Sequence, residues 1–332
     1  MINGSDAEVP MPLYQLHSQG PEVAQLQTRL KALGLYAGPV DADFGGGTLA
    51  AVKAFQQANG LTTDGQVGPQ TWAALFAGET IAEPDIVRQP LAYRCLALTG
   101  SFETGTAPPD CFAGLSGDFD GQGLSFGVLQ WNLGQGSLQP LLVEIDRTQP
   151  ALTRRIFDTH YAEFQAMLGL DRDDQLLWAR SIQDRATFRL VEPWAGMFKT
   201  LGRAPELQSV EMKYAQQVYQ DATVLCGLYG VSSERAVALM FDIKVQNGSI
   251  NTVVQAQIQR DVAGLDAALQ GDDLEVARLQ IIANRRAEAA NPQWVEDVRQ
   301  RKLTIANGTG VVHGRRYDLA AQYGVRLTRA GG

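Results

Sequence analysis

The hydrophobic pattern in the first third of the chain predicts three short helices joined by turns. Residues 21–34 place apolar side chains on one helical face and end in a glycine, a common C-terminal cap. Residues 47–60 repeat this pattern, and residues 68–76 form a shorter segment with a proline near its start. The apolar positions on the first two faces are Val23, Leu26, Leu30, Leu33, Val52 and Phe55.

The turns that precede the second and third helices share a pattern. Residues 41–48 (DADFGGGT) and 64–71 (DGQVGPQT) have an aspartate, an apolar residue, a glycine and a threonine at the same spacing. In each segment we expect the aspartate to make a tight turn and the threonine to cap the next helix. The repetition indicates one structural device used twice.

The segment from 20 to 78 resembles the type 1 peptidoglycan-binding domain, a three-helix module of cell-wall hydrolases. The residues that carry the resemblance are VAQLQTRLKALGLYAGPVDADFG, which starts at Val23, and TLAAVKAFQQANGLTTDGQVGPQTWAAL, which starts at Thr48. They cover nearly the whole family pattern. The resemblance implies that this module binds peptidoglycan, without indicating which of its residues touch the glycan.

The remainder of the chain has a mainly helical pattern. The fold class that we predict is mainly α, with an α+β second domain that contains one small β-hairpin. The hairpin is expected within 119–131, where Leu124, Phe126 and Val128 alternate with other residues. The predicted organisation is an N-terminal extension (1–19), the three-helix module (20–78), a linker (79–88) and the second domain (89–332).

Composition and charge exclude several classes of partner. The 332 residues are 45% hydrophobic and 19% charged, and the formal net charge is −8. An anionic chain without a basic patch is a poor match for nucleic acid, and its apolar runs are too short to span a membrane. The three histidines, His17, His160 and His313, have no metal-ligand spacing, so we expect no metal. We also expect no cofactor and a monomer.

The chain start has neither a basic region nor an apolar core of the kind that signal peptides carry. We therefore expect synthesis in the cytoplasm and action on cell-wall peptidoglycan after release through a holin-type pore or as a secreted effector. The sparse cysteines, Cys95, Cys111 and Cys226, do not form a disulfide framework, and pairing of Cys95 with Cys111 stays open.

The positions of three acidic residues are compatible with glycoside hydrolysis. This chemistry needs one carboxylic acid and one carboxylate on opposite sides of a sugar, and the two must come from different elements. Glu103 near a helix end can supply one, and Asp118 or Asp120 in the hairpin segment can supply the other. Glycines beside the aspartates, Gly123 among them, would let a sugar approach the backbone.

The segments SFETG and GDFDGQGLSFGVLQWNLGQGSLQPLL resemble the lysozyme superfamily, and most closely the chitosanases of glycoside hydrolase family 46. The resemblance implies a lysozyme-like fold and an inverting mechanism. It makes Glu103 the general acid, Asp120 the general base acting through water, and Ser125 the hydroxyl that holds this water. Asp118 matches no catalytic position, and we interpret it as a turn former or a carboxylate lining the cleft.

The chain departs from that family at positions that bear on substrate. Ser137 stands where the chitosanases have an aspartate that recognises the glucosamine amine, and Gln122 stands where they often have arginine. Gln130 and Asn132 supply neutral amides that suit an N-acetylated glycan, although capping of the hairpin is an equal alternative. Trp131 should face away from them, toward the core.

Together these features predict a peptidoglycan hydrolase, a muramidase or endolysin that cleaves the β-1,4 bond of the glycan strand. Three alternatives stay open: a chitosanase with a wall-binding module, a lytic transglycosylase, and a non-catalytic wall-binding protein. A transglycosylase needs the acid but no base, so Asp120 and Ser125 favour hydrolysis.

Overall fold

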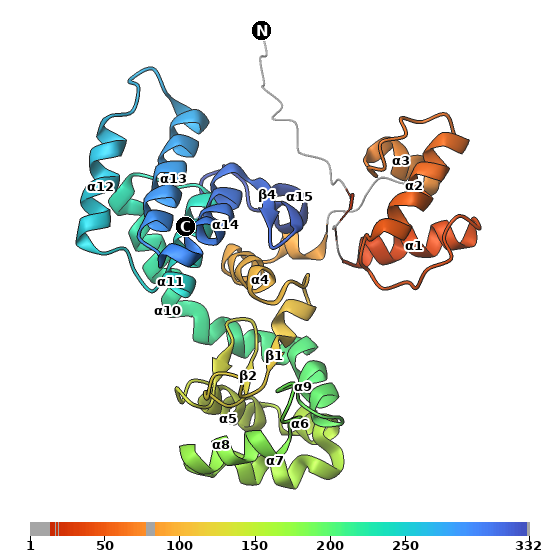
Figure 1. Ribbon diagram of the computed structural model, residues 1–332, viewed down its shortest axis with the longest axis vertical. Coiled ribbons are helices and arrows are strands. Elements are labelled where there is room, and N and C mark those ends of the chain that lie inside the picture. Colours follow the sequence, from red (N-terminus) through yellow and green to blue (C-terminus); the bar gives the residue numbers. More distant parts are fainter. Residues whose placement is uncertain (1–13, 17, 19, 78–83, 331–332) are drawn as a thin grey trace. The chain divides into compact units, whose positions relative to one another are not determined.

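The computed structural model describes the chain except residues 1–13, 17, 19, 78–83 and 331–332 (Figure 1). Most of the expected N-terminal extension and the first part of the expected linker lie outside the described residues. The chain divides into two compact units. Unit 1 comprises the residues up to Arg94 with Tyr229–Leu239 and Ile250–Gly332, and unit 2 comprises Cys95–Leu228 and Met240–Ser249.

The N-terminal module in unit 1 has the three helices that the hydrophobic pattern predicts. They are α1 (Pro21–Ala32), α2 (Gly46–Ala58) and α3 (Pro69–Leu75). Their apolar faces enclose one core with Phe44, Val67 and Trp72 at less than 3% exposure. Leu33 differs from the prediction, because α1 ends at Ala32 and leaves Leu33 41% exposed.

The repeated turn pattern is built around two buried glutamines. Gln27 on α1 donates through Nε2 to Asp41 Oδ1 at 2.7 Å and to Thr48 Oγ1 at 3.2 Å. Gln56 on α2 does the same with Asp64 Oδ1 at 2.9 Å and Thr71 Oγ1 at 3.2 Å. A buried amide that joins a turn to the next helix fixes both, because an unpaired amide would be costly in the core.

Each aspartate of the repeat closes its turn as expected, whereas the threonines do not cap helices. Asp41 accepts a hydrogen bond from the backbone N–H of Asp43, and Asp64 accepts one from Gln66. The N-cap positions of α2 and α3 are glycines without a side-chain cap. The threonines instead lie inside the first turn of each helix and accept from the buried glutamines.

Unit 2 is a helical array around a small sheet. Its helices are the C-terminal part of α4 (Leu91–Thr104), then α5 (Leu138–Thr148), α6 (Pro150–Phe157), α7 (Tyr161–Leu168), α8 (Arg172–Ser181), α9 (Trp194–Arg203), most of α10 (Pro205–Tyr229) and part of α11 (Glu234–Asn247). Helix α5 buries Leu138, Leu141, Leu142 and Ile145, the spacing of an amphipathic helix. The Phe157 and Phe164 rings stack at 4.0 Å in the same core.

The C-terminal part of unit 1 adds four helices and a second hairpin. These helices are α12 (Thr252–Ala263), α13 (Gly271–Glu288), α14 (Val295–Asn307) and α15 (Leu319–Tyr323). The hairpin pairs β4 (Thr309–Val312) with β5 (Arg315–Asp318), and the sequence pattern did not predict it. Its turn is His313–Gly314, where both residues have positive φ, as a two-residue hairpin turn requires.

The mainly helical fold class is confirmed, with the additional hairpin as a difference in detail. In the part of the chain that the structure describes, none of the helices combines the length and apolar character that crossing a membrane requires. The three cysteines are buried and form no disulfide, so Cys95 and Cys111 are not paired with each other.

Candidate active site

The predicted hairpin segment, 119–131, forms only part of a three-stranded antiparallel sheet in unit 2, because a strand that precedes the segment adds to it. Its strands are β1 (Leu115–Ser116), β2 (Ser125–Phe126) and β3 (Trp131–Asn132), in that order. Successive residues of a strand face opposite sides of a sheet, so the register forms two rows. The polar row is Ser116, Ser125 and Asn132, and the apolar row is Leu115, Phe126 and Trp131. The apolar row packs on the core of unit 2, as expected for Trp131.

Helix α4 packs against this sheet through positions that lack side chains. A Cβ on Gly100 would overlap the Val128 side chain, and a Cβ on Gly114 would overlap Thr104. Gly100 and Thr104 lie one helical turn apart, on the face of α4 that meets the sheet. Glu103 immediately precedes Thr104 in the last turn of α4, and it is exposed.

The two aspartates of the glycine-rich turn have different environments. Asp118 is 8% exposed, and both of its carboxylate oxygens have partners. Oδ1 accepts from the Gly123 N–H at 2.7 Å, and Oδ2 accepts from Arg180 Nε at 2.5 Å. The Asp118 N–H donates to Gln183 Oε1 at 2.8 Å. Asp118 thus fixes the turn, and its oxygens are already occupied by the protein.

Asp120 is exposed, and one of its oxygens accepts from the backbone N–H of Gln122 at 3.1 Å. Among the described residues, its other oxygen has no hydrogen-bond donor. Gly121 and Gly123 follow this position with φ of 83° and 74°, a conformation that favours glycine. The turn therefore presents one carboxylate to solvent while Asp118 anchors it from below.

Ser125 lies in the middle of the polar row, five residues after Asp120. It is 9% exposed, and its hydroxyl has no hydrogen-bond partner in the described part of the chain. A hydroxyl in this position can hold a water molecule, because it has one donor and two acceptor sites available.

The neutral residues that follow are engaged within the segment itself. Gln130 donates to the Gly127 carbonyl at 2.8 Å and adopts a positive φ of 55°. Asn132 Oδ1 accepts from the Gln135 N–H at 2.8 Å, and Ser137 Oγ accepts from the Asn132 N–H at 3.0 Å. These contacts match the capping alternative. Among the described residues the Asn132 side-chain nitrogen donates no hydrogen bond, so it is the amide donor that this row can offer to a ligand.

Glu211 on α10 is a site residue that the sequence pattern did not single out. It is fully buried, and its Oε1 accepts from the Val128 N–H at 3.2 Å. Burial raises the pKa of this carboxyl well above its usual value. Glu211 lies four residues from Leu207 and from Ala215, both buried, so its place on the apolar face of α10 is the signal that could have revealed it.

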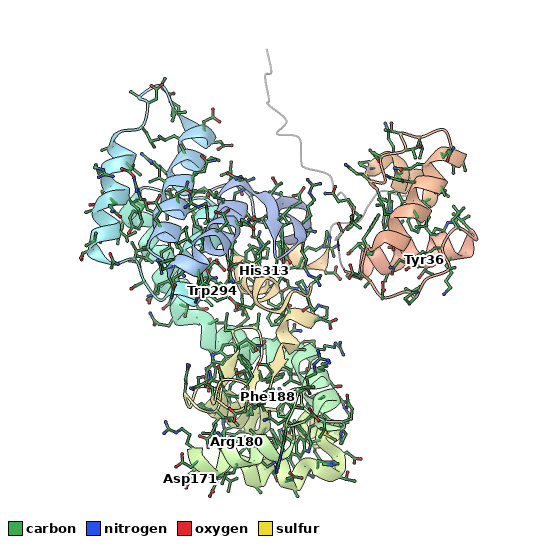
Figure 2. All side chains as sticks on the ribbon, viewed as in Figure 1. Tyr36, Asp171, Arg180, Phe188, Trp294 and His313 are labelled. Carbon is green, nitrogen blue, oxygen red and sulfur yellow. The ribbon has the colours of Figure 1, made fainter. Side chains whose placement is uncertain are left out.

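A pocket of about 550 Å³ lies on the N-terminal module between the end of α1 and the start of α2. Tyr36, Asp41, Asp43 and Thr48 are among the residues that line it. Figure 2 labels Tyr36 on this module. Residues 19–75 match the family model described as "Putative peptidoglycan binding domain". The N-terminal module is a peptidoglycan-binding domain. The Gln27 network therefore shapes the wall of a pocket on this peptidoglycan-binding domain.

Curated relatives share a segment about as long as the peptidoglycan-binding domain. The N-acetylmuramoyl-L-alanine amidase CwlM of Mycobacterium tuberculosis is 45% identical over 65 residues, which is 20% of this chain and 15% of that protein. The spore cortex-lytic enzyme of Bacillus cereus is 46% identical over 57 residues, 17% of this chain and 22% of that protein. The chain thus spans less than a quarter of the length of these two relatives.

Solved structures of chitosanases resemble a larger part of the chain. The native chitosanase from Bacillus subtilis MY002 is 17% identical, covers 72% of this chain and 92% of its own, and has a TM-score of 0.43. The family 46 chitosanase from Gynuella sunshinyii in complex with chitotetraose is 13% identical, covers 68% and 88%, and has a TM-score of 0.39.

Proposed function

We propose that this chain is a peptidoglycan hydrolase that cleaves the β-1,4 bond between N-acetylmuramic acid and N-acetylglucosamine. The observation that carries the proposal is the combination, in one chain, of a peptidoglycan-binding domain and a unit with two exposed carboxyls from different elements. A binding domain tethered to a catalytic unit raises the effective concentration of cleavable bonds.

In this mechanism Glu103 protonates the leaving glycosidic oxygen, and Asp120 removes a proton from the attacking water. Ser125 holds that water, since its hydroxyl has no partner in the described chain. Inversion requires the two carboxyls to be roughly 6.5–9.5 Å apart, so that a water fits between base and sugar. The buried Asp118 acts as the anchor of the turn that carries Asp120, and Gly123 keeps that turn free of a side chain.

An N-acetylated glycan suits the polar row better than a glucosamine polymer does. Ser137 offers no carboxylate to an ammonium group, and its hydroxyl is bonded to the Asn132 backbone. The side-chain nitrogen of Asn132 can donate to an acetamide carbonyl. The amide of Gln130 contributes indirectly, by fixing the turn before β3.

The experiment that tests this proposal compares Glu103→Gln and Asp120→Asn with the wild type on purified sacculi. Loss of an acid or base typically lowers turnover by about 10²- to 10⁴-fold, and sacculus binding should persist through the peptidoglycan-binding domain. Release of reducing ends and mass spectrometry of the products are the measurements. Glu206→Gln, at an exposed position near the start of α10, is the matched control.

Each alternative gives a distinct result in this assay. Products that end in 1,6-anhydro sugars would identify a lytic transglycosylase. Turnover of deacetylated chitosan without turnover of sacculi would identify a chitosanase. A Glu103→Gln variant that releases reducing ends as fast as the wild type would show that another group is the acid. A wild type that binds sacculi and cleaves neither polymer would be a binding protein.

A further inference from the structure

The loop Gln183–Leu190, between α8 and α9, has a fixed conformation of its own. Gln183 and Leu190 form an isolated β-bridge, and the Asp184 N–H donates to the Arg189 carbonyl at 2.8 Å. The Asp184 carboxylate accepts from the backbone N–H groups of Ala186 at 3.0 Å and Thr187 at 2.7 Å. These bonds hold the pKa of Asp184 below its usual value and make the carboxylate part of the loop framework.

This loop is attached to the turn that carries the candidate base. Gln183 accepts from the Asp118 N–H at 2.8 Å, and a Cβ on Gly117 would overlap the Phe188 carbonyl. Arg180, just before the loop, pairs with the Asp118 carboxylate at 2.5 Å. Figure 2 labels Arg180 and, on the loop, Phe188. Asp120 follows Asp118 by two residues, so their Cα atoms are at most about 7 Å apart. The loop therefore flanks Asp120.

The exposed side chains of the loop combine positive charge with an aromatic ring. Arg185 and Arg189 are exposed, and within the described residues neither forms an ion pair or a side-chain hydrogen bond. Phe188 is 39% exposed, and Phe119, beside Asp120, is 66% exposed. The one acidic residue of the loop, Asp184, is used in its own turn. Two arginines without an ion pair among the described residues thus belong to a loop that contacts the Gly117–Asp118 turn, in a chain whose net charge is −8.

We propose that this loop is a subsite for the carboxylate-bearing substituents of the glycan, with Arg185 and Arg189 as the groups that bind them. The proposal rests on the proposed function and deepens it, because the stem peptides of peptidoglycan carry free carboxylates, and so does a lactyl group that bears no stem peptide. A guanidinium group matches a carboxylate in charge and in its two-pronged geometry. Phe188 and Phe119 offer apolar faces to the sugar rings between these substituents. A cationic glucosamine polymer would be repelled by the same arginines.

The test uses the full chain and the double variant Arg185→Gln/Arg189→Gln. Its matched control is Arg147→Gln/Arg155→Gln, which removes the same charge from exposed positions on α5 and α6. Both are assayed on native sacculi and on sacculi whose carboxylates have been converted to amides. Each of two exposed ion pairs contributes at most about five-fold in affinity, so the KM for native sacculi should rise several-fold in the loop variant, up to roughly 25-fold, with kcat little changed. On amidated sacculi the loop variant and the wild type should behave alike.

A loop variant that keeps the wild-type KM on native sacculi would overturn the proposal, and so would an equal loss on both substrates. Binding of a soluble disaccharide-peptide by calorimetry supplies a readout that does not depend on turnover. If the wild type cleaves neither substrate, the proposed function fails, while weaker binding of this probe by the loop variant alone would still support the subsite. Equal binding by the wild type and both variants would refute it.

Discussion

Replacing Glu211 with glutamine removes a buried ionisable group while keeping its shape and its acceptor for the Val128 N–H. Among the described residues, the second carboxylate oxygen of Glu211 is buried without a hydrogen-bond partner. Glutamine places an uncharged NH₂ group there, so the variant imitates the protonated carboxyl. The comparison therefore isolates the cost of ionising this site.

The sign follows from the raised pKa of Glu211, whose main cause is burial. The unfolded chain ionises this group near its ordinary pKa, whereas the folded chain keeps it neutral to higher pH. The stability that the group contributes is complete below the ordinary pKa and is lost as pH rises toward the raised value. The loss is about 1.4 kcal/mol for each pH unit between the two values.

The assay is thermal unfolding of the wild type and Glu211→Gln from pH 4 to pH 8. For a domain of this size, about 1.4 kcal/mol corresponds to roughly 3–6 °C in Tm. The Tm of Glu211→Gln minus the Tm of the wild type should increase by roughly 3–6 °C for each pH unit above the ordinary pKa of glutamate. A difference between the two proteins that does not vary with pH would refute the reasoning.

Glu144→Gln is a control of opposite sign. A hydrogen bond from Lys213 lowers the pKa of Glu144, and the two groups lie 2.7 Å apart. A lowered pKa contributes stability above the ordinary value and loses it as pH falls. The Glu144→Gln variant should therefore be slightly less stable than the wild type at neutral pH and equal to it in acid. Because Lys213 is 67% exposed, the effect should stay below about 1 kcal/mol.

Two further substitutions test packing in each unit. Gly100→Ala places a methyl group against Val128, so α4 must move away from the sheet. The variant should lose about 1–3 kcal/mol of stability in urea unfolding and should be less active. Adding Val128→Ala to it should restore much of the loss, and a Gly100→Ala variant as stable as the wild type would contradict the close approach. Gln27→Ala removes the bridge between a turn and two helices and should destabilise the peptidoglycan-binding domain by about 2–4 kcal/mol. The exposed Gln57→Ala is its control, and equal unfolding midpoints for the two variants would show that the network contributes little.

The helices of the peptidoglycan-binding domain follow from local sequence. Apolar spacing, terminal glycines and Pro69 act within a few residues, so the pattern identified all three helices. The pattern fixes the ends of these helices less well. Leu33 continues the apolar spacing of α1, but the helix ends at Ala32 and the Leu33 side chain is exposed. The pattern did not show that Gln27 and Gln56 are buried, because a glutamine on a helix is usually exposed to solvent. These two are buried because the turns that contain Asp41 and Asp64 pack against them.

The β4–β5 hairpin was missed for a related reason. Its strands have four residues each, and Thr309 and Gly310 at the start give no strong alternation. The pairing becomes visible only through the cross-strand partners and the positive φ values at its turn. Short strands are stabilised by neighbours rather than by their own propensity.

For the candidate site, the sequence by itself determined that Asp118, Asp120 and several glycines lie in one short segment, and that this segment can form a turn. It also predicted, from the period-two alternation of a strand, that Trp131 faces away from Asn132. The register that places Ser125 opposite Asn132 came only with the fold. Tertiary structure decided what each carboxyl does. Asp118 is buried because Arg180, 62 positions later in the chain, reaches its carboxylate, whereas Asp120 stays exposed. Two aspartates two residues apart look equivalent in sequence, because their difference lies in partners that only folding brings to them.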